Sequence, residues 1–526
     1  MNAIKKVNHI AIVSFATLGS RVLGLVRDVL IFSFFGVSAI NSAFIFAFTL
    51  PNLFRRLLGE GALTSAVMPV MAGELEGEGK EAAFSFLNRV ISRLFFVLLG
   101  LVILAIVLLQ CVSLWPGLEE RWYLGARLAS WLMPFMLLIC LAAMFSAALN
   151  LLERFAVPAL SPVWLNLSMM LGLGVFGYFL GKTALEQVYY LCAGVLVGGV
   201  IQCILPAWAL KQEGWKPRMD FSRCERVQEM LGLLMPGLAG AAVFQVNIVV
   251  SRLLAFSLDT SAVSILYLAS RLIELPLGVF TIAITTVVFP GMSKLAARGL
   301  NDDFAEEYAH GMRLILAITV PAAAGLVVLA EPILKILFEW GAFSAQDVKL
   351  TQPVLVISSV GLPFYSMATL ATRAFHALKD TKTPVIIAYI SFAVNLALSL
   401  WWMQVWGVAG LAAASVAAAL LQNIVLRIAL VRKNPRVAQG RFWFSLLEVV
   451  AAAKIMAIIA WLAFDYIQSI WGAGKLGDML AIIFIIPLAM IFYILFLKLF
   501  RFEEAYEIRD LLLGVIWPFK KKPHSA

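Results

Sequence analysis

Apolar stretches of about 20 residues recur along almost the whole chain, and they constrain its fold more than any other feature. A helix needs about 20 mostly apolar residues to cross a bilayer, whereas the strands of a membrane barrel alternate in polarity. The stretches here are continuous, which predicts an all-α polytopic membrane protein with about 14 transmembrane helices. We place the spans at residues 9–35, 41–72, 92–114, 127–151, 157–180, 188–210, 228–256, 262–291, 312–338, 351–377, 383–404, 406–431, 443–468 and 478–500.

Composition agrees with a membrane protein. Of the 526 residues, 62% are hydrophobic and 14% are charged, against about 45–50% and about 25% in soluble domains. The N-terminus imitates a signal peptide, with Lys5 and Lys6 before an apolar run. Because Arg21 and Arg27 interrupt that run and no convincing cleavage site follows, we expect an uncleaved first span.

Basic residues gather in alternate loops, which predicts the orientation of the chain. The loops that alternate with these basic loops hold few basic residues, namely Arg121, Arg127, Lys182, Lys349 and Lys475. Cytoplasmic loops are enriched in Lys and Arg, so both termini are expected in the cytoplasm. The net charge of +10 is interpreted in the same way, as loop and lipid-surface charge and not as a nucleic-acid site. The basic loops hold Lys80, Arg89, Lys211, Lys216, Arg218, Arg223, Arg226, Lys294, Arg298, Lys379, Lys382, Arg432, Lys433, Arg436 and Arg441.

An internal repeat is visible in short proline motifs. Pro134-Phe135 with Ala148-Leu149 matches Pro363-Phe364 with Ala377-Leu378 at an offset of 229. A weaker pair relates Pro51 to Pro276 at an offset of 225. Six spans return the chain to the same side, so this pattern predicts two parallel six-helix lobes in pseudo-twofold repeat, residues 1–227 and 228–441. Residues 442–526 then form two added helices and a basic tail; a chance match of short motifs is the alternative to the repeat.

Charges within the apolar stretches are the candidate site. The first span carries Arg21, Arg27 and Asp28, and the second carries Arg55, Arg56 and Glu60. Each charge costs about 2.5–3.5 kcal/mol if it faces lipid at mid-membrane. Several such charges predict a wet, cationic cavity and an anionic cargo.

Helical geometry and helix-breaking residues refine this candidate site. Residues 21 and 28 are seven apart and share one helix face, and 20 and 27 share the neighbouring face. The eighth span adds Arg271 and Glu274, one turn apart. Guanidinium groups stay charged in a poor dielectric and present a planar fork of donors to phosphate oxygens. The predicted substrate-binding residues are Arg21, Arg27, Arg55 and Arg271; the supporting ion-pair residues are Asp28, Glu60, Glu274 and Arg56; and the predicted hinges are Gly24, Pro51, Gly59 and Gly61.

The same charged residues have a structural alternative, in which they form buried ion pairs and bind no cargo. Enzyme signatures are lacking from the sequence: it has no Gly-rich nucleotide loop and no HExxH, and its histidines at 9, 310, 376 and 524 are scattered. The five cysteines form no CxxC pair. No catalytic residue, metal site or cofactor is predicted.

Four segments resemble one known family. They are SRVLGLVRDVL, AFTLPNLFRRLLGEGALTSAVMPV, LASRLIELPLGVF and FHALKDTKTPVIIA, and together they resemble the MurJ (MviN) lipid II flippase family over roughly residues 10–400. This family belongs to the multidrug/oligosaccharidyl-lipid/polysaccharide exporter superfamily. The resemblance implies fourteen helices, two lobes and alternating access, in the bacterial inner membrane. It also implies a cargo, the undecaprenyl-diphosphate-linked peptidoglycan precursor, that moves from the inner to the outer leaflet.

The resemblance also implies roles for single residues. Arg21, Arg27, Arg55 and Arg271 match the family's essential cavity arginines, and Asp28 and Glu60 match its acidic positions. The last two spans resemble the family's added pair, which forms a groove for the lipid tail. The chain departs from the pattern at Ser42 and Ser270, where the family often has Asp. These changes make the predicted cavity more cationic and put a simple transfer of the family's ion coupling in doubt.

Three other functions share parts of this pattern. A polysaccharide-repeat flippase of the same superfamily would share the architecture and the anionic lipid carrier. A cation-drug antiporter should have a more acidic cavity, and a non-transporting scaffold would bind cell-wall enzymes without moving lipid. Membrane lipids, and other cell-wall synthesis proteins besides the lipid cargo, are the expected partners. The coupling ion or membrane potential that would energise transport is not identified by the sequence.

Overall fold

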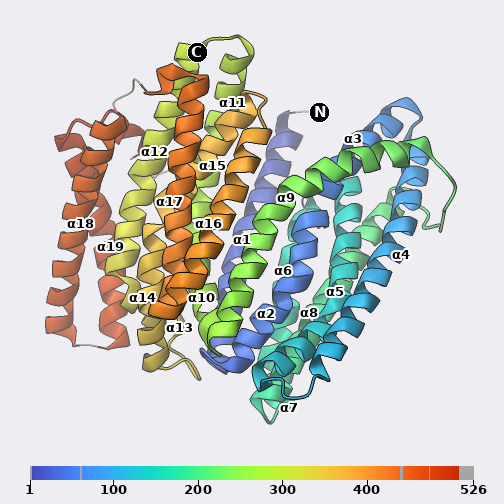
Figure 1. Ribbon diagram of the computed structural model, residues 1–526, viewed down its shortest axis with the longest axis horizontal. Helices are drawn as coiled ribbons and strands as arrows, with labels where there is room; N and C mark the ends of the chain where they lie inside the picture. The colour runs from blue at the N-terminus through green and yellow to red at the C-terminus, as the bar shows by residue number, and fades with distance from the viewer. Residues whose placement is uncertain (1–2, 60–61, 439–441, 473, 509–526) are drawn as a thin grey trace. The chain divides into compact units, whose positions relative to one another are not determined.

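The computed structural model describes residues 3–59, 62–438, 442–472 and 474–508, and no strand occurs within these ranges. Helices follow one another with short connections (Figure 1). This is the arrangement that a bilayer demands, because each backbone N–H and C=O must be bonded within its own segment. The predicted all-α class is confirmed.

The chain packs as two compact units. The first comprises residues 1–264 with Trp340–Phe343, and the second comprises Ile265–Glu339 with residues 344–526. The helices of the first unit are α1 (Ala3–Phe35), α2 (Ala39–Phe54), η1 (Arg55–Gly59), α3 (Ala62–Gly77), α4 (Lys80–Ser113), α5 (Glu120–Leu151), α6 (Ala156–Leu171), η2 (Gly172–Gly177), α7 (Tyr178–Leu180), α8 (Ala184–Gln212) and α9 (Glu225–Leu258).

The second unit begins within α10. Its helices are α10 (Ala262–Pro276), η3 (Leu277–Thr281), α11 (Ile282–Ala297), α12 (Asn301–Val328), α13 (Ala330–Phe338), α14 (Ala345–Val360), α15 (Leu362–Ala377), α16 (Lys382–Trp406), α17 (Val408–Lys433), η4 (Pro435–Ala438), α18 (Phe442–Trp471) and α19 (Lys475–Leu499).

These helices account for the predicted spans. Among the described residues, 11 helical segments are long and apolar enough to cross a membrane. The other three predicted spans coincide with α1, with α2 and α3, and with α9. The structure therefore agrees with about 14 transmembrane helices.

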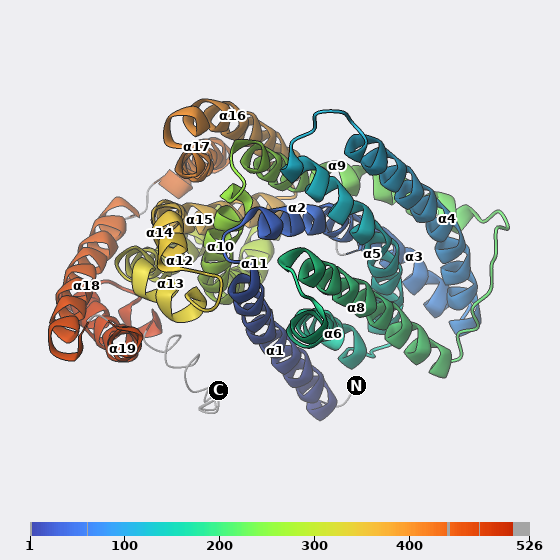
Figure 2. The same cartoon turned by 90° about the horizontal axis from the view of Figure 1, so that it is seen from below.

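Packing divides the chain at a different place from the predicted lobes. Helix α9 packs against α2, η1 and α3, which places it in the first unit. The boundary between the units consequently follows residue 264 and not residue 227. The lobes 1–227 and 228–441, which were drawn from repeated motifs and not from packing, stay a prediction. Helices α18 and α19 pair with each other and pack on α12 and α13 of the second unit (Figure 2).

Helices α5 and α15 end in the same way. Each is followed by a non-glycine residue in the left-handed region, Glu153 or Lys379, both with a φ of 59°. The N–H of Arg154 donates to Leu149 O at 2.8 Å, and the N–H of Asp380 donates to Phe375 O at 2.9 Å. These hydrogen bonds close the two helices as a left-handed cap does. The caps are related by an offset of 226 (153 to 379), which is within one residue of the proline pair at 225. The offset of 229 is therefore three residues too long for this pair of helices.

Glycines allow α8 to pack closely against α6 and η2. A Cβ on Gly194 would lie 2.6 Å from Ser168 O, and one on Gly172 would lie 2.7 Å from Tyr190 O. Contacts this short are not possible for a Cβ atom, so the two backbones can approach only because these residues lack one. Small residues play this role in membrane helix packing, where no hydrophobic force draws helices together.

We expect Gly194→Ala to lower stability by about 1–3 kcal/mol, because the added methyl group must push apart two backbones. Thermal unfolding in detergent measures the loss. Gly73→Ala is the matched control, because a Cβ on Gly73 meets nothing within 4 Å. Equal melting temperatures for the Gly194→Ala variant and the wild type would show that the helices separate without cost.

A buried carboxylate ties the segment after α19 to α12. Glu504 is 3% exposed and forms an ion pair with Arg313, and His310 Nδ1 lies 3.4 Å from its Oε1. Burial raises the pKa of Glu504, but the hydrogen bonds from His310 and Arg313 outweigh it and leave the pKa below its usual value. Phe502 and Ile508 are buried nearby in the core of the second unit.

The lowered pKa of Glu504 makes this contact sensitive to acid. Its contribution to stability should be complete above pH 4.5, the ordinary pKa, and should be lost as pH falls through the lower folded-state pKa. Glu504→Gln should destabilise the protein by about 3 kcal/mol at neutral pH and flatten this part of the pH profile. Thermal unfolding between pH 3 and pH 7 measures both effects. If the stability of the Glu504→Gln variant falls in acid as steeply as that of the wild type, Glu504 is not the group responsible for the acid sensitivity.

Candidate cationic site

Two charged residues of the first span, Arg27 and Asp28, are buried in a contact between helices. Arg27 is 8% exposed and Asp28 is fully buried. Arg27 Nη2 donates to Asp28 Oδ1 at 2.6 Å, and Nε donates to the same oxygen at 3.1 Å. The two residues are adjacent in sequence, so the guanidinium group bends back along α1 to reach its neighbour. The charge of Arg27 is thus compensated within its own helix.

Helix α6 completes this contact. Asn166 is 5% exposed; its Oδ1 accepts from Arg27 Nη1 at 3.1 Å, and its Nδ2 donates to Ser20 O at 3.1 Å. Met169 Sδ lies 3.8 Å from Arg27 Nη1. Asn166 is not among the residues predicted from the sequence. The available signal was a polar residue within an otherwise apolar helix, which in a membrane usually has a polar partner on a neighbouring helix.

The second span bends where proline and π-helical geometry coincide. Pro51 lies within α2 and has no N–H for the helix ladder. The π-helix η1 follows at Arg55–Gly59, and Arg55 Nε donates to Asn52 Oδ1 at 3.1 Å. Single π turns are frequent at functional sites. Arg55 is thus the first residue of an irregular segment of the helix.

The eighth span also combines a proline with a π-helix, but its arginine precedes both. Helix α10 ends at Pro276 and is followed at once by the π-helix η3. Five residues before the proline, Arg271 Nη1 donates to Glu274 Oε2 at 3.2 Å. Both side chains are partly exposed, at 31% and 54%, so this ion pair is far more accessible than that of Arg27.

The other predicted residues differ in their surroundings. Arg21 and Arg56 are half-buried, Gly24 is buried in α1, and Gly59 is the last residue of η1. Glu60 and Gly61 lie outside the described residues. Arg21, Arg27 and Arg55 belong to the first unit and Arg271 to the second, so their convergence on one cavity stays a prediction.

Two further polar contacts bear on the departures from the family pattern. Ser42 is fully buried, and its hydroxyl donates to Ser264 Oγ at 3.1 Å. The two hydroxyl groups form a hydrogen bond at this position and bring no charge into the interior. A carboxylate at the same position would have introduced a buried charge. Ser270 is exposed. A separate contact joins α9 to α2, because Arg252 Nη1 donates to Thr49 Oγ1 at 2.9 Å.

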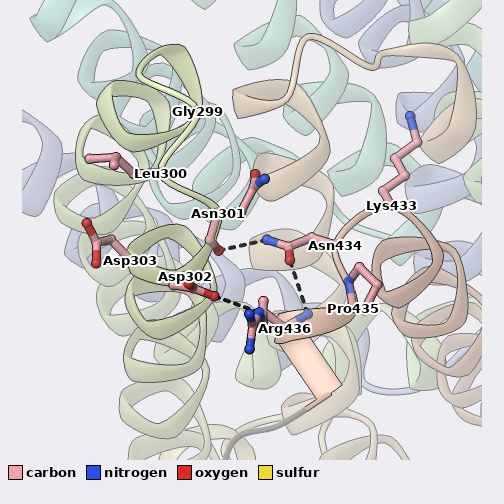
Figure 3. Close-up of a pocket in the computed structure, with 9 residues that line it drawn as sticks. All are labelled: Gly299, Leu300, Asn301, Asp302, Asp303, Lys433, Asn434, Pro435 and Arg436. Atoms are coloured by element: carbon pink, nitrogen blue, oxygen red, sulfur yellow. Dashed lines mark hydrogen bonds and ion pairs between the residues drawn. The ribbon is translucent and has the colours of Figure 1, made fainter.

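A cavity of about 530 Å³ lies at the loops before α12 and after α17 (Figure 3). Asn434 Nδ2 donates to Asn301 O at 2.9 Å, and Arg436 pairs with Asp302 at 2.9 Å (Figure 3). None of the predicted site residues lines it. Its mixed charges hold two loops together, and it is not the candidate site.

Comparison with known proteins identifies the class and then the family. The fold matches transporter structures: a multidrug resistance MATE family transporter of the MOP superfamily in an inward-facing conformation aligns with a TM-score of 0.65 at 13% identity, over 80% of this chain and 96% of that one. Such likeness defines a polytopic membrane transporter fold. A structure described as lipid II flippase MurJ, inward closed conformation, aligns with a TM-score of 0.78 at 26% identity, covering 92% and 98% of the two chains.

Sequence relatives make the assignment specific. The family model described as "Lipid II flippase MurJ" matches residues 31–484. A probable lipid II flippase MurJ of Bdellovibrio bacteriovorus is 33% identical over 94% of both chains, and that of Thermotoga maritima is 29% identical over 97% of this chain and 99% of its own. The chain belongs to the MurJ lipid II flippase family, as its motifs predicted; it is a multi-pass membrane transporter and not an enzyme.

The Arg27 contact can be tested by removing its counter-charge. We expect Asp28→Leu to destabilise the protein by about 3–5 kcal/mol, because a guanidinium group is then left buried without this carboxylate. Thermal unfolding in detergent measures the effect. The double variant Arg27→Leu/Asp28→Leu should recover much of the loss. If the loss of stability in the double variant equals the sum of the losses in Arg27→Leu and Asp28→Leu, the two residues are not coupled.

Proposed function

We propose that this protein moves lipid II from the inner to the outer leaflet of the cytoplasmic membrane. The observation that carries the proposal is the match to the lipid II flippase family over residues 31–484, together with cationic side chains inside apolar helices. The diphosphate of the cargo would be neutralised by Arg21, Arg27, Arg55 and Arg271, while the polyprenyl tail stays in lipid.

In this proposal the carboxylates hold the arginines between transport events. Asp28 occupies the guanidinium group of Arg27 and Glu274 that of Arg271. A diphosphate offers bidentate oxygens to the same donors. Exchange of carboxylate for phosphate, and back, neutralises the arginines at every stage and lets the cargo leave. Glu60 and Arg56 are assigned supporting roles of the same kind.

Alternating access requires flexible points in the helices. Pro51 and the π-helix that follows it interrupt the regular ladder of the second span. A segment of this kind absorbs a change of backbone angle at lower cost than a continuous α-helix. We assign the hinge to Gly24, Pro51, Gly59 and Gly61.

The basic loops favour a cytoplasmic location for both termini. With this orientation, the membrane potential assists transport, because an anion leaves the negative interior. A cargo with two negative charges gains about 4–5 kcal/mol per 100 mV across the full field. The proposal assigns no coupling ion. Other cell-wall synthesis proteins are its expected partners in the cell.

Arg271 gives the sharpest test because its ion pair is partly exposed and its loss should leave the fold intact. We expect Arg271→Gln to lower lipid II flipping about 10- to 100-fold, the cost of one charged hydrogen-bonding group to phosphate. The assay measures how much lipid II reaches a membrane-impermeant reagent outside cells that depend on the variant. Lys349→Gln, the loss of an exposed charge near the start of α14, is the control. Normal flipping by an Arg271→Gln protein that inserts normally would refute the role of Arg271.

A further inference from the structure

The connection between α8 and α9, residues 213–224, is fixed along α4; we call it the α8–α9 strap. Trp215 Nε1 donates to Asn88 Oδ1 at 2.8 Å, and Asn88 Nδ2 donates to Lys216 O at 2.9 Å. The backbone N–H of Asp220 donates to Ser92 Oγ at 2.9 Å. Both views show the strap beside α4 (Figures 1 and 2). It is therefore an ordered part of the surface of the first unit.

The tip of the strap reaches further along α4 than its start. Arg93 Nη2 donates to the carbonyls of Phe221 and Ser222 at 2.9 and 2.6 Å, and the rings of Phe221 and Phe96 lie 5.6 Å apart. The contacts thus run from Asn88 to Phe96, about 12 Å of helix at 1.5 Å per residue. The strap descends about two turns of α4.

The tip meets an exposed apolar part of α4. Helix α4 contains a strongly apolar window of which only 11% is buried. Phe96 is 52% exposed at the beginning of this face. On the strap, Met219 and Phe221 are 60% and 54% exposed. The apolar tip therefore continues the lipid-facing surface of α4, and the outer layer of a bilayer is the surrounding that covers both.

Basic side chains flank this tip. Lys216, Arg218 and Arg223 are all exposed on the strap. Asp220 lies between these cations, but its charge is compensated by an ion pair in which Arg89 Nε is 3.1 Å from Asp220 Oδ2. Hydrogen bonds from Ser222, and one from Arg89, hold the pKa of Asp220 below its usual value. An apolar tip between exposed cations has the chemistry of a segment that lies at the level of phosphate headgroups.

We propose that the α8–α9 strap is a binding surface for anionic phospholipids of the bilayer, with Met219 and Phe221 inserted below the headgroups and Lys216, Arg218 and Arg223 bound to their phosphates. The strap leads directly into α9, which packs on α2 and α3. Bound lipid therefore stabilises the position of α9. The inference does not depend on which substrate the protein transports.

The charge arm of the test compares the full-length protein in nanodiscs of phosphatidylcholine with and without phosphatidylglycerol. The wild-type melting temperature should rise with phosphatidylglycerol. Arg218→Gln/Arg223→Gln should lose at least half of this rise, and high salt should remove it from the wild type. Lys182→Gln/Lys349→Gln removes the same charge from exposed positions elsewhere and should keep the rise. An undiminished rise in the strap variant would overturn the proposal.

The second part of the test measures how deeply the tip of the strap enters the bilayer. Met219→Cys, in a protein whose five native cysteines are replaced by serine, is labelled with a polarity-sensitive fluorophore. The label should report an apolar surrounding and be quenched by nitroxides at the lipid headgroups. The same label at Lys182→Cys should report water. A water-like signal at position 219 would overturn insertion of the tip.

Discussion

A guanidinium group inside a bundle of apolar helices must have its charge compensated, and this constraint organises the first unit. Arg27 meets it through Asp28, one residue away, and through Asn166 on α6. The carboxylate neutralises the charge, and the amide joins two helices at the same point. A residue that could bind an anion is thus also part of the packing between α1 and α6.

Breaks in the helices supply the second organising feature. The π-helices η1 and η3 both follow a proline, Pro51 in α2 and Pro276 at the end of α10. Arg55 is the first residue of η1, and Arg271 lies six residues before the start of η3. A regular helix would present such side chains at fixed 100° steps. The extra residue of a π turn changes the direction of the side chains beyond it, and each of these breaks lies within six residues of a predicted cavity arginine in the chain.

Predictions from local pattern succeeded where one force dominates. The length and continuity of the apolar stretches predicted the spans, because a membrane barrel would need shorter strands of alternating polarity. The repeat was harder. Matching prolines gave an offset of 229, whereas the shared left-handed caps at Glu153 and Lys379 give 226. Pro134 lies inside α5, but its predicted counterpart Pro363 begins α15 after a break at Gly361. Proline has two roles in these helices, so its position is a poor marker of register.

By itself, the sequence determined the class of fold, the family and the identity of the charged residues, because hydrophobic length and charge are properties of local segments. Only the tertiary structure decided which groups compensate those charges. Asn166 is 139 residues from Arg27 in the chain, and Thr49 is 203 residues from Arg252. A hydrogen bond needs atoms within about 3 Å of each other, and that proximity arises only when distant helices pack side by side.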